Sequence, residues 1–284
     1  MNQEIIDLYD EYTHAPLSRN EFIKRLTILA GSLTAAMSIL PLIEVNAAGA
    51  AITAADDLET GYISYEGVNG TMKAYMAKPS TNQKLPAVVV IHENRGLNAR
   101  IEDVARRAAK AGYLAIAPNI LSPLGQLPEN DDELRAKFST LKPEESLQNF
   151  IRAFGYLRTS KDCNGQFGCV GFCWGGAMAN NLAVEVPDLK AAVAFYGRQP
   201  NTEAVGRIKA AVQLHYGGLD ERVNAGIPAY EAALKLNNTP YELYLYEGVN
   251  HAFHNDTAPT RYNEAAAKLA WQRTLDFFQK HLKA

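Results

Sequence analysis

Short apolar segments alternate with amphipathic segments along most of the chain, from residue 61 to its end. The segment 86–92 is continuously apolar and begins at a proline, which is typical of a strand buried on both faces. The segment 99–112 has apolar residues at helical spacing and stops at Gly112. The same reasoning predicts strands over 113–118, 166–173, 191–197, 210–217 and 241–248, and helices over 143–160, 174–186, 225–238 and 260–281.

Strands that are separated by helices usually form a mostly parallel sheet with helices on both faces. We therefore predict one α/β domain over residues 51–284, with an antiparallel hairpin from 62–66 and 71–79 at its beginning. The longest stretch without a periodic pattern, 119–143, predicts a loop or lid over one end of the sheet.

The first fifty residues have a different pattern. Arg19, Lys24 and Arg25 precede an uncharged apolar run over 26–43, and small residues follow, which is the layout of an export signal. The stretch 18–24 resembles a twin-arginine signal in which Asn20 replaces the second arginine. We expect export to the periplasm, and the alternative is a helix docked on the domain of a cytoplasmic protein. Pro41 interrupts the run, so a stable membrane span is not expected.

Composition narrows the class of protein. The chain has 284 residues, of which 47% are hydrophobic and 21% charged, and its formal net charge is −3. These values are ordinary for a globular domain and leave no basic surface for nucleic acid. Three cysteines cannot all pair within the chain, so a disulfide framework is not expected and at least one thiol is free.

One of these cysteines lies in the sequence GFCWGG, residues 171–176, at the junction of a predicted strand and helix. The spacing G-x-C-x-G is that of the nucleophile elbow of α/β-hydrolases with sulfur in place of oxygen. Such a turn exposes the side chain at a helix N-terminus, where free amides and the helix dipole favour a thiolate. Cys173 is therefore the candidate nucleophile, whereas Cys163 and Cys169 are expected to be small core residues.

An acid and a histidine follow at the ends of later strands. Asp220 comes just past the predicted strand 210–217, and His251 comes just past 241–248. The order nucleophile, acid, histidine is the one that this kind of hydrolase has. Either residue alone could be a turn former or a structural histidine, but their order and positions predict a Cys173–Asp220–His251 triad.

The chain also resembles the dienelactone hydrolases, a branch of the α/β-hydrolases, over nearly all of residues 61–282. The stretches that carry the resemblance are HENRG (92–96), GFCWGG (171–176), FYGR (195–198), GGLDERV (217–223) and NHAFHND (250–256). It implies an α/β-hydrolase fold without a large cap domain, and hydrolysis of an ester or lactone by Cys173, Asp220 and His251 through an acyl-thioenzyme. It further implies that Glu93 pairs with the resting thiol, and that the amides of Trp174 and Asn94 form the oxyanion hole.

The chain departs from this family at the arginines that hold the substrate carboxylate. No arginine follows the fourth strand, and the position four residues after His251 is Asn255. Arg95 and Arg198 are the candidate replacements, with Arg261 as a further one. Without the usual clamp, we expect a preference for neutral esters or lactones.

Two other functions remain open. A general carboxylesterase or thioesterase would use the same residues on other small acyl substrates. A non-catalytic redox sensor would use Cys173 as an oxidisable thiol, but would not need Asp220 and His251. A small-molecule substrate is the expected partner; no cofactor is expected, and the scattered histidines lack the spacing of a metal site.

Overall fold

The computed structural model describes residues 1–15, 17–44, 53–128 and 131–283. An eight-stranded sheet forms its centre, with the strand order β1-β2-β4-β3-β5-β6-β7-β8. The strands are β1 (Leu58–Glu66), β2 (Thr71–Pro79), β3 (Leu85–Ile91), β4 (Leu114–Asn119), β5 (Cys163–Phe172), β6 (Leu189–Phe195), β7 (Ala211–Gly217) and β8 (Tyr241–Tyr246). Strand β2 runs antiparallel to both of its neighbours, and the pairings from β4 through β8 are all parallel. The predicted α/β class, the mostly parallel sheet and the hairpin are confirmed.

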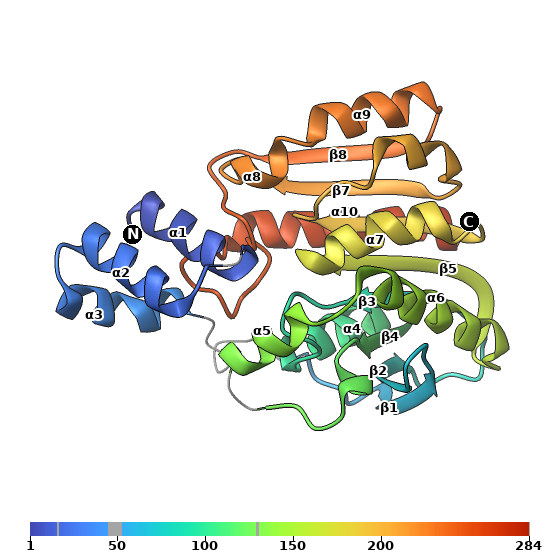
Figure 1. Cartoon of the computed structure of the whole chain (residues 1–284). Coiled ribbons are helices and arrows are strands. Elements are labelled where there is room, and N and C mark those ends of the chain that lie inside the picture. Colours follow the sequence, from blue (N-terminus) through green and yellow to red (C-terminus); the bar gives the residue numbers. More distant parts are fainter. Residues whose placement is uncertain (16, 45–52, 129–130, 284) are drawn as a thin grey trace.

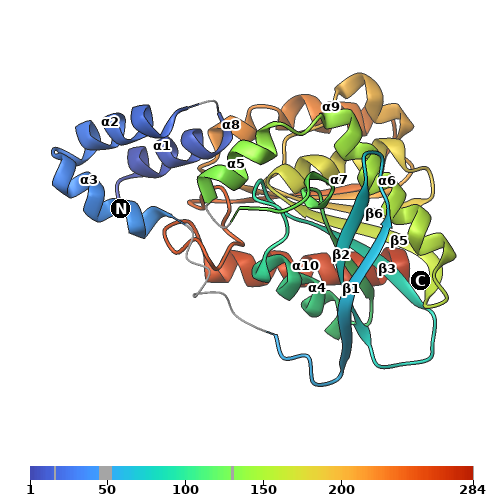
Figure 2. The ribbon, with the colours of Figure 1, turned by 60° about the horizontal axis from the view of Figure 1, so that its bottom comes forward.

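Helices cover both faces of the sheet, as Figures 1 and 2 show. The helices of the domain are α4 (Ala99–Lys110), α5 (Asp131–Ser139), α6 (Pro143–Thr159), α7 (Trp174–Glu185), α8 (Glu221–Asn224), α9 (Ile227–Leu236) and α10 (Glu264–Leu282), with short 3-10 turns η2 (Ser122–Leu124) and η3 (Thr202–Arg207). Helices α6, α7 and α9 contribute to one buried cluster, and α4 and α10 to the other. Along β3, Val89 and Ile91 belong to the first cluster while Val88 and Val90 belong to the second. This alternation explains why the strand is apolar at every position.

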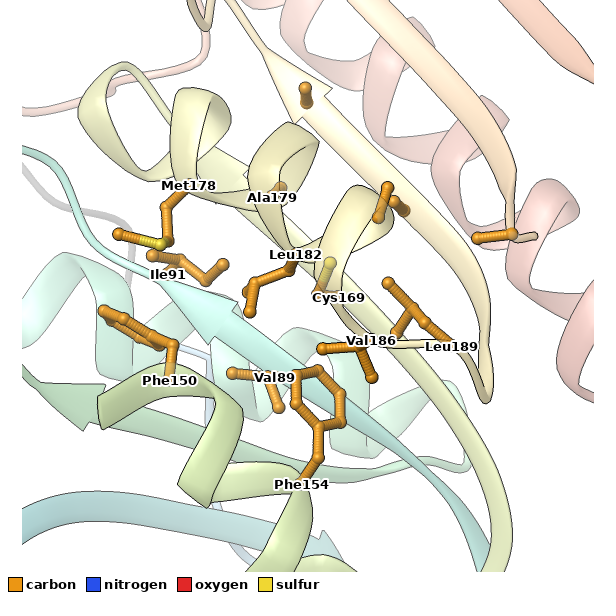
Figure 3. Close-up of a cluster of buried hydrophobic side chains, with 14 of the residues drawn as sticks. Val89, Ile91, Phe150, Phe154, Cys169, Met178, Ala179, Leu182, Val186 and Leu189 are labelled. Carbon is orange, nitrogen blue, oxygen red and sulfur yellow. The ribbon is translucent and has the colours of Figure 1, made fainter. Parts of the chain in front are cut away.

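Figure 3 shows the cluster beneath α6 and α7. Phe150, Phe154 and Leu182 pack against Val89 from the central strand. The second of the three cysteines, Cys169, lies here with no exposed surface. Apolar burial of this kind is the main favourable contribution to folding.

The first part of the chain forms three helices beside the sheet, drawn in blue in Figure 1: α1 (Gln3–His14), α2 (Arg19–Ala30) and α3 (Leu33–Ile43). They have their own apolar cluster, which contains Tyr9 and Tyr12 from α1, Phe22 and Leu26 from α2 and Leu40 from α3. The last turn of α1 lies beside α5 and α8, at the carboxyl ends of the strands (Figures 1 and 2). The small residues of the expected export signal, 45–50, and the domain boundary at 50/51 fall outside the described residues.

Among the described helices, none is by itself long and apolar enough to cross a membrane. Helices α2 and α3 together meet that criterion by length and composition, but they meet at a bend of 110°.

The segment 119–143 was predicted to be a loop or lid, and the structure corrects this in part. It contains η2 and helix α5, although its sequence shows no clear helical period. Within α5, Phe138 reaches the main buried cluster and packs against the ring of Trp174 with centroids 4.9 Å apart. Tertiary packing therefore determines this helix more than its own pattern does.

Candidate active site

Cys173 lies at a sharp corner between β5 and α7. Its backbone has φ 56° and ψ −113°, outside the regions that residues other than glycine usually adopt. This conformation turns the side chain out of the strand and places it at the N-terminus of α7, as the elbow pattern predicts.

Two neighbouring glycines permit the corner because the backbone segments pass very close together. A Cβ atom at Gly171 would lie 1.8 Å from the carbonyl oxygen of Gly175. A Cβ atom at Gly175 would lie 2.4 Å from the carbonyl oxygen of Ile91 on the adjacent strand. These glycines are therefore required by close approach, although neither has a positive φ.

Asp220 and His251 meet at the same edge of the sheet. Asp220 caps the short helix α8 after β7 and accepts a hydrogen bond from the amide of Val223. Its Oδ2 lies 2.5 Å from Nδ1 of His251, in the turn after β8, and both side chains are buried. Because a carboxylate only accepts, Nδ1 of His251 carries the proton and Nε2 is left as the acceptor.

A ring nitrogen of His251 lies within 4.8 Å of Cys173 Sγ, and its Nε2 is buried without a hydrogen bond among the described residues. Burial lowers the pKa of His251, but the carboxylates of Asp10 and Asp220 outweigh this effect and raise that pKa. The imidazole is therefore a stronger base than a free histidine side chain, and no hydrogen bond to a described residue occupies its Nε2.

The sequence reasoning did not identify His14, which contacts the nucleophile directly. Nε2 of His14, in the last turn of α1, lies 2.8 Å from Cys173 Sγ. Asp10, one helical turn earlier, has its carboxylate 3.2 Å from Nδ1 of His14. The spacing of Asp10 and His14 on one helix face was the available signal, but the sequence does not show where that face docks.

Glu93 has partners different from the one that the resemblance implies. Its carboxylate accepts hydrogen bonds from Asn255 Nδ2, at 2.8 Å, and from the Tyr196 hydroxyl, at 3.3 Å. Arg100 lies 3.9 Å away. Burial raises the pKa of Glu93, but Arg100 and the other nearby cations outweigh this and lower it. Glu93 is thus a carboxylate behind Tyr196, and the group beside the thiol is His14.

A cavity of about 660 Å³ opens beside Cys173. His251, Trp174 and Tyr196 line it from the domain, and Thr13 and His14 line it from α1. The candidate oxyanion residues lie on its wall: Trp174 is the first residue of α7, and Asn94 follows β3.

The candidate substrate-binding arginines occupy different places. Arg198 is exposed on the cavity wall, and its guanidinium has no ion pair within the described part of the chain. Arg95 is not among the residues that line this cavity and donates to the hydroxyl of Tyr9, at 3.3 Å. Arg261 is buried and contacts Asp10 at 3.7 Å. The wall also contains Arg135 and Arg222, which the sequence reasoning did not single out.

Two groups of side chains are close enough to hold a metal ion, which the scattered histidines had not suggested. They are His14, Cys173 and His251, and Asp10, Asp220 and His251. In the first group, the 2.8 Å between His14 Nε2 and Cys173 Sγ is shorter than the roughly 3.5 Å expected between nitrogen and sulfur ligands of a tetrahedral zinc ion. In the second, Nδ1 of His251 is already bonded to Asp220. The geometry therefore fits two hydrogen-bonded acid–base pairs, His14 with Cys173 and His251 with Asp220, rather than two sets of metal ligands.

The other cysteines lie in the buried sheet core. Cys163 and Cys169 are both buried, and burial raises the pKa of each thiol. A thiol held neutral in this way is a poor nucleophile. The expectation that these two are core residues is confirmed.

Comparison with known proteins places the chain in a family. Residues 72–282 match the model of the dienelactone hydrolase family. A protein of Saccharolobus solfataricus, provisionally named carboxymethylenebutenolidase, is 33% identical over 256 residues, which cover 77% of this chain and 97% of that protein. A Bradyrhizobium protein, provisionally named 2-oxo-3-(5-oxofuran-2-ylidene)propanoate lactonase, is 32% identical over 232 residues, or 76% of this chain and 92% of that one.

A solved structure agrees with these relatives. The crystal structure of a provisionally identified dienelactone hydrolase from Klebsiella pneumoniae superposes with a TM-score of 0.71 and 28% identity, over 79% of this chain and 99% of that one. The chain therefore belongs to the dienelactone hydrolase family and is a hydrolase of ester or lactone bonds.

Proposed function

We propose that the chain cleaves its ester or lactone through a Cys173–His251–Asp220 triad and an acyl-thioenzyme. The observation that carries the proposal is the strained corner, which presents Cys173 to a cavity together with a histidine already bonded to a carboxylate. A buried carboxylate fixes the tautomer of the imidazole and stabilises its charged form.

The reaction has two steps. The Cys173 thiolate attacks the acyl carbon, and the resulting tetrahedral intermediate expels the alcohol oxygen, which takes its proton from an imidazolium beside the sulfur. His251 then accepts a proton from water at Nε2, and hydroxide displaces the thiolate from the acyl group. The amides of Trp174 and Asn94 donate to the oxyanion in both steps, and losing one such donor typically costs about 10²–10³ in rate.

Glu93 supports the site through Tyr196. The Tyr196 hydroxyl donates to the Glu93 carboxylate, and the Tyr196 ring lies 4.9 Å from that of His251. Because Glu93 contacts neither the thiol nor His251 in the hydrogen bonds described, we assign it a positioning role.

The substrate is proposed to be a lactone or a small ester. The names of the relatives refer to butenolide and furanone rings, and the cavity is large enough for a ring of that size. A general esterase differs only in its acyl group, so a panel of lactones and p-nitrophenyl esters separates the two.

The first experiment tests the nucleophile. Cys173→Ala is expected to abolish hydrolysis while the protein stays folded, and iodoacetamide should label Cys173 before Cys163 or Cys169. Cys163→Ala is the matched control and should hydrolyse esters at the native rate. Full activity in Cys173→Ala would contradict the triad. Selective labelling without hydrolysis of any substrate would instead favour the redox sensor.

A further inference from the structure

The hydrogen-bond partner of the nucleophile comes from the beginning of the chain. Cys173 Sγ lies 2.8 Å from His14 Nε2, 159 positions earlier, whereas His251 makes no hydrogen bond to the sulfur. The thiol therefore has two imidazoles close by, from two distant parts of the sequence.

The orientation of His14 follows from its neighbours. Its Nδ1 lies 2.7 Å from the backbone carbonyl oxygen of Asp10, which can only accept, so Nδ1 carries a proton and Nε2 faces the sulfur. The Asp10 carboxylate also lies 3.2 Å from Nδ1. A carboxylate and an imidazole therefore approach the nucleophile Cys173 from two sides. Asp10 and His14 do so from α1, and Asp220 and His251 do so from the other side.

Helix α1 is fixed in this position by polar contacts to the rim of the site. Asn94 Nδ2 donates to the carbonyl of Thr13 at 2.7 Å, and Arg222 Nη2 pairs with Asp10 at 2.9 Å. Arg135 Nη1 donates to the carbonyl of Tyr12 at 3.0 Å.

The helix does not fill the substrate space. His14 and Thr13 line the same cavity of about 660 Å³ as Cys173 does, so room for an acyl group remains with α1 in place. An imidazole that touches the sulfur and faces this room can also reach the leaving group of a bound ester.

We propose that His14 is a second catalytic imidazole, which holds Cys173 as a thiolate at rest and protonates the leaving group. The inference rests on the proposed function and adds a residue outside the matched family region, 72–282. The sulfur–carbon bond forms as the carbonyl π electrons move to oxygen. When that intermediate collapses, the carbon–oxygen bond breaks and the alkoxide takes the proton from His14 Nε2. His251 is then free to deprotonate water in the second step, and the hydroxide attacks the acyl carbon. When the second intermediate collapses, the carbon–sulfur bond breaks and the sulfur leaves as the thiolate. Two protons remain, one on His251 and one on the product acid; one of them restores the His14 imidazolium and the other passes to solvent.

The charges around His14 favour this state. The groups that face it or its carboxylate partner are Asp10 on α1, Cys173 at the start of α7, His251 after β8, Arg222 on α8, Arg135 on α5 and Arg261 before α10. Burial lowers the pKa of His14, but Cys173 and Asp10 outweigh it and raise the pKa to about 9. The imidazolium therefore persists through neutral pH, where it can donate to a thiolate.

The experiment compares His14→Gln with the native full-length chain. The rate of Cys173 alkylation by iodoacetamide is measured against pH by intact and peptide mass spectrometry, and kcat/KM is measured on one ester. We expect alkylation at about pH 6.5 to fall at least about tenfold, because an ordinary thiol ionises near 8.5. We expect kcat/KM to fall about 100-fold. Glu11→Gln, on the exposed side of the same helix, is the matched control and should change neither value.

A second variant covers the case in which His14→Gln does not fold. Asp10→Asn keeps the imidazole but removes its carboxylate, and should slow alkylation in the same direction by a smaller factor. The idea is overturned if a folded variant alkylates with the native pH profile, even where hydrolysis falls. Alkylation needs no substrate turnover, so this outcome is distinct from failure of the triad, which Cys173→Ala tests.

Discussion

At the scale of single side chains, the hydrogen bond between Asp220 and His251 determines which nitrogen of the imidazole carries the proton. His251 is buried, with Nδ1 2.5 Å from the carboxylate and Nε2 without a hydrogen bond among the described residues. A buried imidazole in this state accepts a proton at one nitrogen only, which gives the proposed base a direction as well as a location.

We expect His251→Ala to lower kcat at least about 1000-fold, because the base for water is lost. Asp220→Asn should lower kcat less, by about 100-fold, because the imidazole remains but its orientation is lost. If His14 protonates the leaving group, His251→Ala should also accumulate an acyl-thioenzyme, visible as an added acyl mass on the intact protein. His281→Ala, on α10, is the control for removing a histidine. Native turnover in both site variants would place the catalytic base elsewhere.

Arg198 is the residue that we expect to determine how the cavity binds a charged substrate. The preference for neutral substrates was predicted from the absence of arginine at the usual positions, yet Arg198 lies on the cavity wall without an ion pair within the described residues. We expect Arg198→Ala to lower kcat/KM for a carboxylate-bearing lactone about tenfold. A neutral ester of similar size should change less than about twofold. Equal effects on the two substrates would show that Arg198 does not meet the anion.

The residues that sequence could predict share one property. Cys173 follows β5 directly, and Asp220 and His251 lie in the turns just past β7 and β8. Parallel strands bring their carboxyl ends to one edge of the sheet. His14 follows no strand, and its contact with Cys173 depends on how α1 docks. Glu93 was assigned a partner by resemblance, whereas its contacts depend on Tyr196 and Asn255, which no local pattern links to it.

At the scale of elements, Asp10 is one of the residues that join α1 to the domain. Its carboxylate pairs with Arg222 at 2.9 Å, lies 3.7 Å from Arg261, and lies 4.0 Å from Nε2 of His251. Burial raises the pKa of Asp10, but His251, His14 and Arg222 outweigh it and hold that pKa well below its usual 3.8. A carboxyl whose pKa is lowered in the folded state stabilises the protein above its unfolded pKa.

We expect Asp10→Asn to lower the free energy of unfolding by about 2 kcal/mol at neutral pH, since it leaves a largely buried set of cations without their carboxylate. The difference from the native chain should be complete above about pH 4 and shrink as the pH falls through the lowered pKa. Thermal unfolding between about pH 2 and 7 measures it. Asp7→Asn, on the exposed side of the same helix, is the control and should match the native curve. A difference that stays constant with pH would contradict the ionisation argument.

Helices and strands with a strong periodic pattern of apolar residues could be predicted from the sequence. Elements that form mainly through contacts with distant residues could not. The strand β3 and the helix α4 were evident from continuous and helical apolar spacing. Helix α5 was missed, because its packing depends on Phe138 reaching Trp174 rather than on a repeated apolar face. The short helix α8 was missed as well, since four residues capped by Asp220 are too few to show a period.

At the scale of the whole molecule, the described residues form three buried apolar clusters. Two cover the faces of the sheet, and the third, within α1–α3, shares no residue with them. Helices α1–α3 are therefore attached to the domain chiefly by polar contacts at the candidate active site, such as the hydrogen bond from Asn94 to Thr13. Residues of α1 line both the main cavity and a second one of about 440 Å³, and His251 lines both as well.

Removal of α1–α3 tests what this attachment contributes. Removing residues 1–50 should leave a folded α/β domain, because both clusters on the sheet remain complete, and should join the two cavities around His251. If α1 is a wall of the site that supplies His14, the truncated enzyme should hydrolyse esters about 100-fold more slowly and lose fast alkylation of Cys173 at about pH 6.5. If α1 is instead a segment to be removed on export, truncation should leave hydrolysis unchanged or make it faster. A full-length chain with a protease site inserted at 45–52, cut but not separated, is the control, because α1 keeps its contacts there. We then compare kcat/KM of the cut chain before and after the released helices are removed. This comparison separates the contribution of α1 to catalysis from the effect of cutting the chain.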